Sequence, residues 1–259
     1  MAVQPEDRVN ILGVGVSAVS MSEAVRRTEA LLEESDHKGY ICVTGVHGIM
    51  EAQGDEEFRK ILNRSFLTTP DGMPTVWMGH LHGFKAMTRV YGPDFMVEVC
   101  RESVALGYRH FLYGGKPGVA EELRAELIRR FPGINIAGTY TPPFRPLNAE
   151  EEEDLRTQLT ASKADILWCG LSTPKQERFM AMYSDKLPVQ LMVGVGAAFD
   201  LLSGNLKEAP DWMKRSGLQW FYRLLMEPRR LWKRYLGNNP RFVWLTMLQL
   251  TRLRRFPVM

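Results

Sequence analysis

The feature that most constrains this chain is an alternation between short apolar runs and longer stretches with helical spacing, sustained over about 200 residues. We expect strands at residues 9–16, 40–43, 66–69, 110–113, 134–138, 166–170 and 190–195. Helices are expected between them, at residues 20–34, 46–63, 73–82, 93–106, 117–131, 148–162 and 174–183, the second interrupted near Gly54. Strands that alternate with helices of this length are typical of βαβ units. The pattern therefore predicts an α/β, Rossmann-like fold, with a parallel sheet covered by helices on both faces.

In folds of this class, ligands bind beyond the carboxyl ends of the strands. The loops that follow the expected strands are therefore the first places to look for a site. They are residues 44–48, 70–74, 114–118, 139–145, 170–176 and 194–200.

The pattern changes after Gly204, where no further strand is expected. Residues 211–216 and 218–236 have helical spacing and are rich in aromatic residues and arginine. Residues 238–240 (Asn-Asn-Pro) are expected to break the chain before a last helix at 241–256. We therefore expect an α/β catalytic body at residues 1–204 and a basic, aromatic α-helical appendage at residues 205–259.

Charge is distributed unevenly along the chain. Residues 207–259 hold 12 Lys/Arg and 3 Asp/Glu, a net charge of +9, whereas the remaining residues carry 21 basic and 27 acidic side chains, a net charge of −6. A basic tail of this kind suits an anionic partner such as lipid head groups, phosphates or nucleic acid. The alternative is an ordinary solvated helical face.

Other sequence features limit the protein class. The 3 cysteines match neither a zinc pattern nor a disulfide framework, which favours a reducing compartment. The polar N-terminus does not resemble a signal peptide, and no apolar run reaches the length of a membrane span. These features favour a cytoplasmic protein.

Residues 13–18 match the Gly-x-Gly-x-x-Ala pattern of a dinucleotide-binding turn. In such a fold the second strand should end in an acidic residue that binds the ribose hydroxyls. Here that strand reads Tyr-Ile-Cys-Val-Thr and has no acid. A nicotinamide-dependent oxidoreductase is therefore an alternative, and an ordinary tight turn from a strand into a helix is the preferred interpretation of this segment.

Two loops carry candidate chemistry. Gly114, Gly115 and Lys116 follow a strand, and Pro117 can begin the next helix, whose exposed N–H groups would suit a phosphate. Asp71 lies at the carboxyl end of another strand, where a carboxylate could act as a general base. Both segments could equally be plain turns.

Metal binding has little support in the sequence. No Asp-x-Asp motif occurs, and the pair His80 and His82 has no cluster of carboxylates or thiols beside it. We therefore expect neither a metal ion nor another cofactor.

The expected C-terminal helix presents arginines at a regular spacing. Arg223, Arg230 and Arg234 are 7 and 4 residues apart, which places them on one side of a helix. Guanidinium groups suit the oxygens of a diphosphate. The neighbouring aromatic residues suit either a packed core or a membrane interface.

Several segments taken together resemble one family, the WecG/TagA/CpsF glycosyltransferases (glycosyltransferase family 26). The resemblance covers about residues 9–236 and rests on seven motifs in the same order. They are residues 70–74 (PDGMP), 89–94 (RVYGPD), 114–118 (GGKPG), 173–177 (TPKQE), 194–200 (GVGAAFD), 209–213 (APDWM) and 217–234.

The resemblance implies an inverting, metal-independent transfer of a sugar from a UDP-sugar to a polyprenyl-diphosphate-linked saccharide. The acceptor would be met at the inner face of the bacterial cell membrane, in surface polysaccharide biosynthesis. It also implies that Asp71 is the general base. The substrate-binding residues it implies are Arg89, Asp94, Gln176, Asp200, Arg223, Arg230 and, as a third cation, Lys233 or Arg234.

One departure from the family concerns the donor sugar. The family's Thr-x-Asn motif falls on Val43-Thr44-Gly45, so the Asn is absent. Thr44 or His47 is the candidate for that role. The donor sugar, the acceptor sugar and the oligomeric state stay open.

The preferred hypothesis is therefore a membrane-associated glycosyltransferase that uses a UDP-sugar, a polyprenyl-diphosphate acceptor and an anionic membrane surface, without nucleic acid. Besides the oxidoreductase, a second alternative is a non-catalytic protein that binds anionic lipid or nucleic acid through its basic tail. That alternative does not explain the motifs at the strand ends.

Overall fold

A computed structural model describes residues 7–34 and 37–258 of the chain. Six strands form one sheet in the order β4-β3-β8-β7-β5-β6, and the pairings from β3 to β6 are parallel. The strands are β3 (Gly39–Thr44), β4 (Leu67–Pro70), β5 (Arg109–Gly114), β6 (Asn135–Tyr140), β7 (Ile166–Gly170) and β8 (Leu191–Gly194). The expected α/β, Rossmann-like class is confirmed.

The chain divides into two compact units. The first comprises Ser22–Cys42 and Gly92–Lys207, and the second comprises the segment up to Met21, Val43–Tyr91 and the segment from Glu208 onward. The boundaries of these two units differ from the expected boundary between a body at residues 1–204 and an appendage at residues 205–259. The C-terminal helices share a unit with the N-terminal segment. Whether residues 1–204 fold without the rest stays a prediction.

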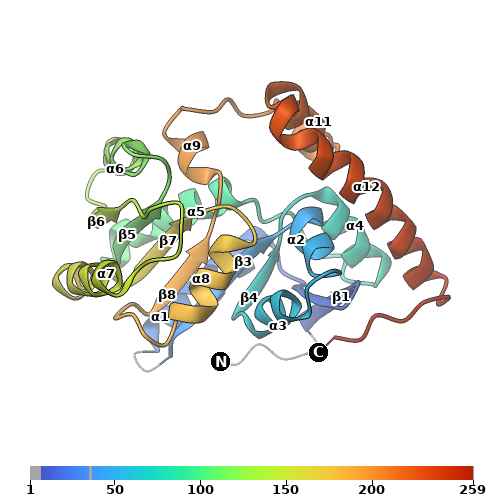
Figure 1. The fold of residues 1–259 in the computed structure, drawn as a ribbon, viewed down its shortest axis with the longest axis horizontal. Coiled ribbons are helices and arrows are strands. Elements are labelled where there is room, and N and C mark those ends of the chain that lie inside the picture. Colours follow the sequence, from blue (N-terminus) through green and yellow to red (C-terminus); the bar gives the residue numbers. More distant parts are fainter. Residues whose placement is uncertain (1–6, 35–36, 259) are drawn as a thin grey trace. The chain divides into compact units, whose positions relative to one another are not determined.

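The first unit is a layered α/β structure. Its helices are α1 (Met21–Glu33), α5 (Gly92–Leu106), α6 (Val119–Arg130), α7 (Ala149–Ser162), α8 (Lys175–Tyr183) and α9 (Ala198–Leu202). Helices α5, α6 and α9 pack together on one side of strands β5 to β8, and α7 and α8 lie on the other (Figure 1). Strands β5, β7 and β8 are buried almost throughout, which explains their continuous apolar runs, whereas the edge strand β6 is mostly half-buried.

The core of the first unit is centred on Trp168 in β7, which is fully buried. Phe95 meets the Trp168 ring edge-on with 6.4 Å between centroids, and His110 stacks on the other ring at 6.1 Å. The Trp168 Nε1–H donates a hydrogen bond of 2.9 Å to His110 Nδ1. This bond satisfies the indole N–H inside an otherwise apolar layer.

In the second unit, the strand expected at residues 9–16 is instead a hairpin of two antiparallel strands, β1 (Arg8–Ile11) and β2 (Val14–Ser17). Leu12 and Gly13 form its two-residue turn with φ of 53° and 83°, the positive values that tight hairpin turns require. The turn was hidden from the sequence because Leu12 is apolar and buried. Gly13 is thus a hairpin residue, and the dinucleotide interpretation of residues 13–18 is wrong.

The remaining helices of the second unit are α2 (Val46–Glu51), α3 (Glu56–Arg64), α4 (Met73–Leu81), α10 (Asp211–Arg215), α11 (Gln219–Met226) and α12 (Pro228–Leu250). The expected interruption near Gly54 separates α2 from α3. Of the described residues, no helix is long and apolar enough to cross a lipid bilayer.

The C-terminal helices break at a different proline from the expected one. Glu227 has φ −132° and ψ 57°, and Pro228 begins α12, because a residue before proline disfavours the helical conformation and proline suits the first helical position. Pro240 instead lies inside the continuous helix α12 (Figure 1). The buried residues Phe242 and Leu245 beyond it hold the helix in place despite the lost N–H donor.

Candidate active site

Asp71 lies at the carboxyl end of β4, as the position of residues 70–74 after an expected strand predicts. Its backbone N–H donates a 3.0 Å hydrogen bond to the carbonyl of Thr44, the last residue of β3. The carbonyl of Pro70 accepts a 2.9 Å bond from the N–H of Val90. Asp71 is therefore fixed between two neighbouring loops, and its side chain is only half-buried.

Gly45 allows these loops to meet. A Cβ at this position would lie 2.5 Å from the carbonyl oxygen of Asp71 and 3.7 Å from its Oδ2. There is no room for a side chain at position 45, which gives a physical reason for the missing Asn of the family motif.

The two candidates for the role of that Asn have different surroundings. The Thr44 hydroxyl is buried and has no hydrogen-bond partner within residues 7–34 and 37–258. His47, on α2, accepts a 3.2 Å hydrogen bond at Nδ1 from Asn238 of α12 and lies 3.6 Å from Glu51. Of these two candidates, Thr44 is therefore the one whose backbone carbonyl is hydrogen-bonded to Asp71, and His47 is the one that contacts α12.

Arg89 connects the Asp71 region with α11. Its Nη1 donates a 2.8 Å hydrogen bond to Gln219, and its guanidinium lies 4.7 Å from the ring centroid of Tyr91. Burial raises the pKa of the Tyr91 phenol, and the negative charge of Asp71 raises it further, whereas Arg223 and Arg89 oppose the rise. The Asp71 carboxylate and the guanidinium groups of Arg223 and Arg89 therefore have opposite effects on the pKa of the buried Tyr91 phenol.

Two of the three C-terminal arginines meet at one carboxylate, although they lie on different helices and not on the single helix expected at residues 218–236: Arg230 of α12 and Arg223 of α11 both pair with Glu227. Burial lowers the pKa of Arg234, and the positive charges of Arg223 and Arg230 lower it further. Burial raises the pKa of Tyr235 against the opposing charges of these same arginines, and Asp71 adds to the rise. We call Arg223, Arg230 and Arg234 the arginine cluster.

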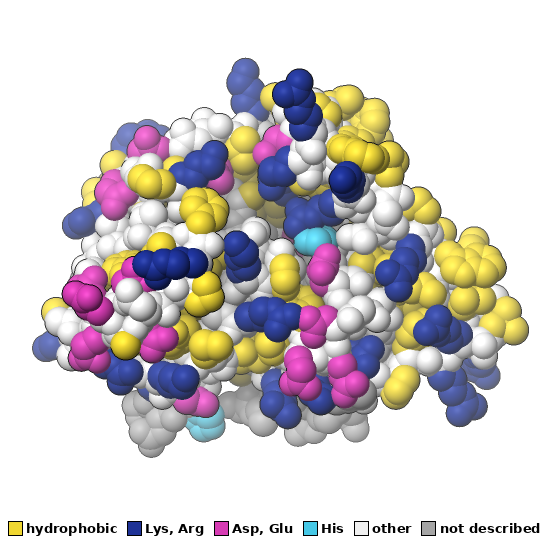
Figure 2. All heavy atoms as spheres, in the orientation of Figure 1, with side chains coloured by type: hydrophobic (Ala, Val, Ile, Leu, Met, Phe, Trp, Pro, Cys, Tyr) yellow, Lys and Arg dark blue, Asp and Glu magenta, His cyan; other side chains and the backbone are white. Residues whose placement is uncertain are grey.

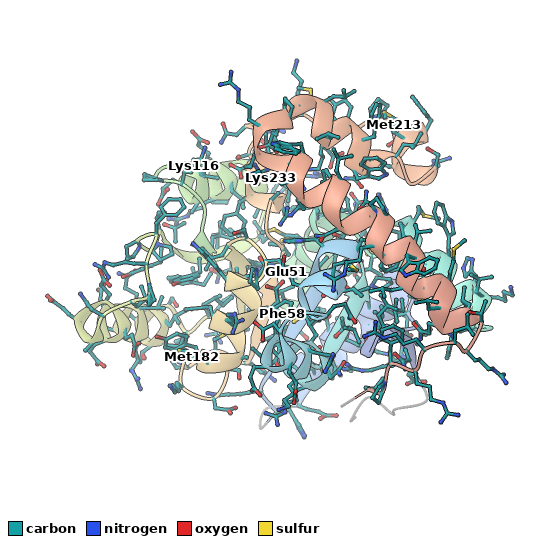
Figure 3. All side chains as sticks on the ribbon, turned by 45° about the vertical axis from the view of Figure 1, so that its right-hand side comes forward. Glu51, Phe58, Lys116, Met182, Met213 and Lys233 are labelled. Atoms are coloured by element: carbon teal, nitrogen blue, oxygen red, sulfur yellow. The ribbon has the colours of Figure 1, made fainter. Side chains whose placement is uncertain are left out.

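Lys233, the other candidate for the third cation, lies elsewhere on α12. It is exposed, and its Nζ lies 5.6 Å from the ring centroid of Trp232 (Figure 3). The burial of Arg234 and the effect of Arg223 and Arg230 on its pKa favour Arg234 over Lys233 as the third cation, and this choice stays a prediction.

In the first unit, the glycine-rich segment forms the loop from β5 to α6. The N–H of Gly115 donates a 3.2 Å bond to the carbonyl of Gly170 at the end of β7, so Gly114 and Gly115 lie beside the next strand end. Lys116 is exposed, and its carbonyl accepts a 3.0 Å bond from Val119, the first residue of α6. The loop thus leads directly into a helix N-terminus, as expected for a phosphate loop.

Gln176 joins the loops after β7 and β8. Its Oε1 accepts a 3.0 Å bond from the N–H of Gly196, and its Nε2 donates a 3.0 Å bond to Glu177. Thr173 donates a 2.8 Å bond to the same Glu177 oxygen. Since Gln176 and Glu177 are both buried, their network holds the two loops in one arrangement.

The two expected acidic residues lie on helices of the first unit. Asp94 is in the first turn of α5, and Asp200 is in the first turn of α9, both half-buried. The expected site residues therefore fall into two sets, one in each unit.

The histidine pair that suggested a metal has other partners. His80 Nε2 lies 2.8 Å from the carbonyl of Met87, and His82 Nδ1 lies 2.8 Å from that of Met78. The part of the chain that the structure describes holds no group of three or more His, Cys, Asp or Glu that could bind a metal ion.

Several residues near the site were not singled out from the sequence: Tyr91, Gln219, Glu227, Tyr235 and Asn238. Tyr91 lies inside the motif at residues 89–94, which could have revealed it. Gln219 and Asn238 contact partners 130 and 191 residues away, and Glu227 lies at a helix junction, for which the sequence carries no local signal.

Residues 9–256 match the model of the "Glycosyl transferase WecG/TagA/CpsF family". The chain belongs to the WecG/TagA/CpsF family. It is therefore a glycosyltransferase, as the motifs implied.

Two relatives within the WecG/TagA/CpsF family carry the same name, "N-acetylglucosaminyldiphosphoundecaprenol N-acetyl-beta-D-mannosaminyltransferase". The Bacillus subtilis protein is 33% identical over 183 residues, which is 71% of this chain and 69% of the relative. The Bacillus spizizenii protein is 32% identical over 208 residues, which is 80% of this chain and 78% of the relative.

Proposed function

We propose that this chain transfers N-acetylmannosamine from a UDP donor to an N-acetylglucosaminyl-diphospho-undecaprenol acceptor, an early step in building a surface polymer. The names of the two Bacillus relatives support this choice of sugar and acceptor. The observation that carries the chemistry is the placement of Asp71 at the carboxyl end of β4, hydrogen-bonded to Thr44, within the same unit as Arg89, which bonds Gln219 of α11, the helix that carries Arg223.

Asp71 is proposed as the general base. An acceptor hydroxyl oxygen attacks the anomeric carbon of the donor, and its proton passes to the Asp71 carboxylate as the new C–O bond forms. The bond from the anomeric carbon to the diphosphate oxygen breaks, and UDP leaves with the electron pair. Attack from the face opposite the leaving group inverts the anomeric centre, which fits a β-linked product.

The arginine cluster is proposed to stabilise the leaving group. A departing diphosphate gains negative charge, and preorganised guanidinium groups can stabilise it without a metal ion. Within the first unit, the loop of Gly114, Gly115 and Lys116 is proposed to bind phosphate. Gln176, Asp94 and Asp200 are proposed to help bind the substrates, with Thr44 as the residue beside Asp71.

The C-terminal helices are proposed to contact the anionic inner face of the cell membrane. Exposed hydrophobic side chains gather over α11 and α12 (Figure 2). On α12 they follow helical spacing along one stripe: Trp232, Leu236, Val243, Met247 and Leu250. Three basic residues follow this stripe: Arg252, Arg254 and Arg255. They lie beyond the end of α12, whereas the expected helix at residues 241–256 would have included them, and we propose that they meet lipid head groups.

The test is turnover of a panel of UDP-sugars with a short-chain polyprenyl-diphosphate N-acetylglucosamine acceptor, with and without excess EDTA. We expect UDP-N-acetylmannosamine to be used, a β-linked product, and full activity in EDTA. Turnover of another UDP-sugar alone would overturn the proposed donor. Loss of activity in EDTA with recovery in Mg²⁺ or Mn²⁺ would overturn the metal-free mechanism.

A further inference from the structure

A carboxylate lies within the arginine cluster. Glu227 is the single residue between α11 and α12, and its Oε1 accepts a 2.7 Å hydrogen bond from Arg230 Nε. Its Oε2 accepts a second bond from Arg230 Nη2 at 2.5 Å and lies 3.6 Å from Arg223 Nη2. One carboxylate therefore engages two of the three arginines.

This carboxylate is held in its charged form. The hydrogen bond from Arg230 lowers the pKa of Glu227 against the opposing effect of partial burial, and the charges of Arg230 and Arg223 lower it further. Its side chain is 25% exposed, so solvent and solutes can reach the pair. Glu227 therefore remains an anion at neutral pH.

The charges in the cluster do not balance. Three guanidinium groups and the one carboxylate that pairs with them leave a net charge of about +2. The pKa of Arg234 is lowered by burial first, and the charges of Arg223 and Arg230 add to this effect. A diphosphate brings more than one negative charge, and its oxygens can form the same forked bonds with a guanidinium as a carboxylate does. A diphosphate can thus replace Glu227, whereas a weakly charged anion gains little by doing so.

We propose that Glu227 occupies the diphosphate position of the arginine cluster when no substrate is bound, and that a diphosphate displaces it. Glu227 is then a specificity-determining residue that makes the cluster prefer a diphosphate over smaller anions. This inference rests on the proposed function, in which the cluster binds the diphosphate.

The test uses Glu227→Gln in the full chain, which keeps the size of the side chain and removes its charge. Binding of inorganic pyrophosphate, UDP and inorganic phosphate is measured by calorimetry. We expect pyrophosphate and UDP to bind about tenfold more tightly than to the wild-type protein, because the competing carboxylate is lost. We also expect the preference for pyrophosphate over phosphate to shrink.

Two further variants sharpen the test. Glu227→Asp keeps the charge but withdraws it by one methylene, so its affinities should lie between those of the other two proteins. Glu57→Gln removes a comparable exposed ion pair, with Lys60 on α3, and should leave all three affinities unchanged.

Unchanged or weaker pyrophosphate binding in Glu227→Gln would overturn the proposal, because Glu227 would then only position the arginines. This result differs from failure of the proposed function. Tighter pyrophosphate binding with no turnover of any UDP-sugar would leave the inference standing and refute the function instead.

Discussion

The backbone N–H of Asp71 donates a 3.0 Å hydrogen bond to the carbonyl of Thr44. This bond joins the ends of β4 and β3, and it fixes the backbone of the proposed general base beside a buried threonine hydroxyl. The position of Asp71 thus depends on close contact between two loops, and Gly45 is the residue that permits it.

We predict that Gly45→Ala lowers both the turnover number and the free energy of unfolding, whereas the control variant at Gly54 keeps both close to the wild-type values. The new Cβ at position 45 would lie 2.5 Å from the Asp71 carbonyl oxygen, so the loops must separate, at a cost of about 1–3 kcal/mol. The control is Gly54→Ala, whose nearest neighbour would be 3.9 Å away. Urea unfolding and steady-state kinetics check both variants, and equal activity in the two would contradict the argument.

Asp71→Asn should reduce turnover by a factor of about 10² to 10⁴, the usual contribution of a general base. The amide keeps the shape of the side chain, so UDP affinity and the melting temperature should change little. The measurement is kcat with saturating donor and acceptor. Near-normal turnover would remove Asp71 from the mechanism.

Stability should fall as the pH is lowered from about 6.5 to 4, in part through His110. Burial lowers the pKa of His110 to about 4, well below the 6.5 of an ordinary histidine. The unfolded chain therefore takes up a proton in this window before the folded chain does, which favours unfolding by up to about 3 kcal/mol. Above pH 6.5 the imidazole is neutral in both states and contributes no slope.

The pH effect of His110 can be isolated with His110→Gln. The variant should be less stable at pH 7, but its free energy of unfolding should fall less steeply between pH 6.5 and 4. Urea titrations at several pH values measure this difference. An unchanged slope in His110→Gln would refute the assignment.

Gln249→Ala should destabilise the protein by about 1–2 kcal/mol. Gln249, near the end of α12, accepts a 2.9 Å bond from the N–H of Leu12 and donates a 2.8 Å bond to the carbonyl of Asn10. It thereby anchors α12 to the β1–β2 hairpin. Gln158→Ala, at an exposed side chain on α7, should be nearly neutral by the same urea assay.

Replacing Arg252, Arg254 and Arg255 with Gln should weaken binding to anionic liposomes by about 1 kcal/mol per charge. Turnover on a water-soluble acceptor analogue should be unaffected, since these residues lie beyond the end of α12. Liposome flotation and kinetics separate the two effects. Unchanged flotation would refute a role for these charges at the membrane.

The order of elements and the positions of the candidate loops were predictable because they depend on local patterns. The apolar run at residues 166–170 coincides with β7, and Asp71 follows β4 directly, because a buried strand followed by Pro-Asp-Gly is a short-range signal. The helical spacing that grouped Arg223, Arg230 and Arg234 is equally local, but it assumed one helix over residues 218–236, whereas the chain bends at Glu227 and leaves Arg223 on α11. A shared role of the three arginines stays a prediction.

The sequence by itself therefore determined the α/β class, the family and the residue types at the strand ends. Only the tertiary structure decided that residues 8–17 form a hairpin, that the C-terminal helices break at Pro228 rather than at Pro240, and that Asn238 meets His47. These outcomes depend on contacts between segments up to about 240 residues apart, such as that of Gln249 with Asn10. Periodicity reports which face of an element is buried, but the partner that covers that face is selected by packing across the whole fold.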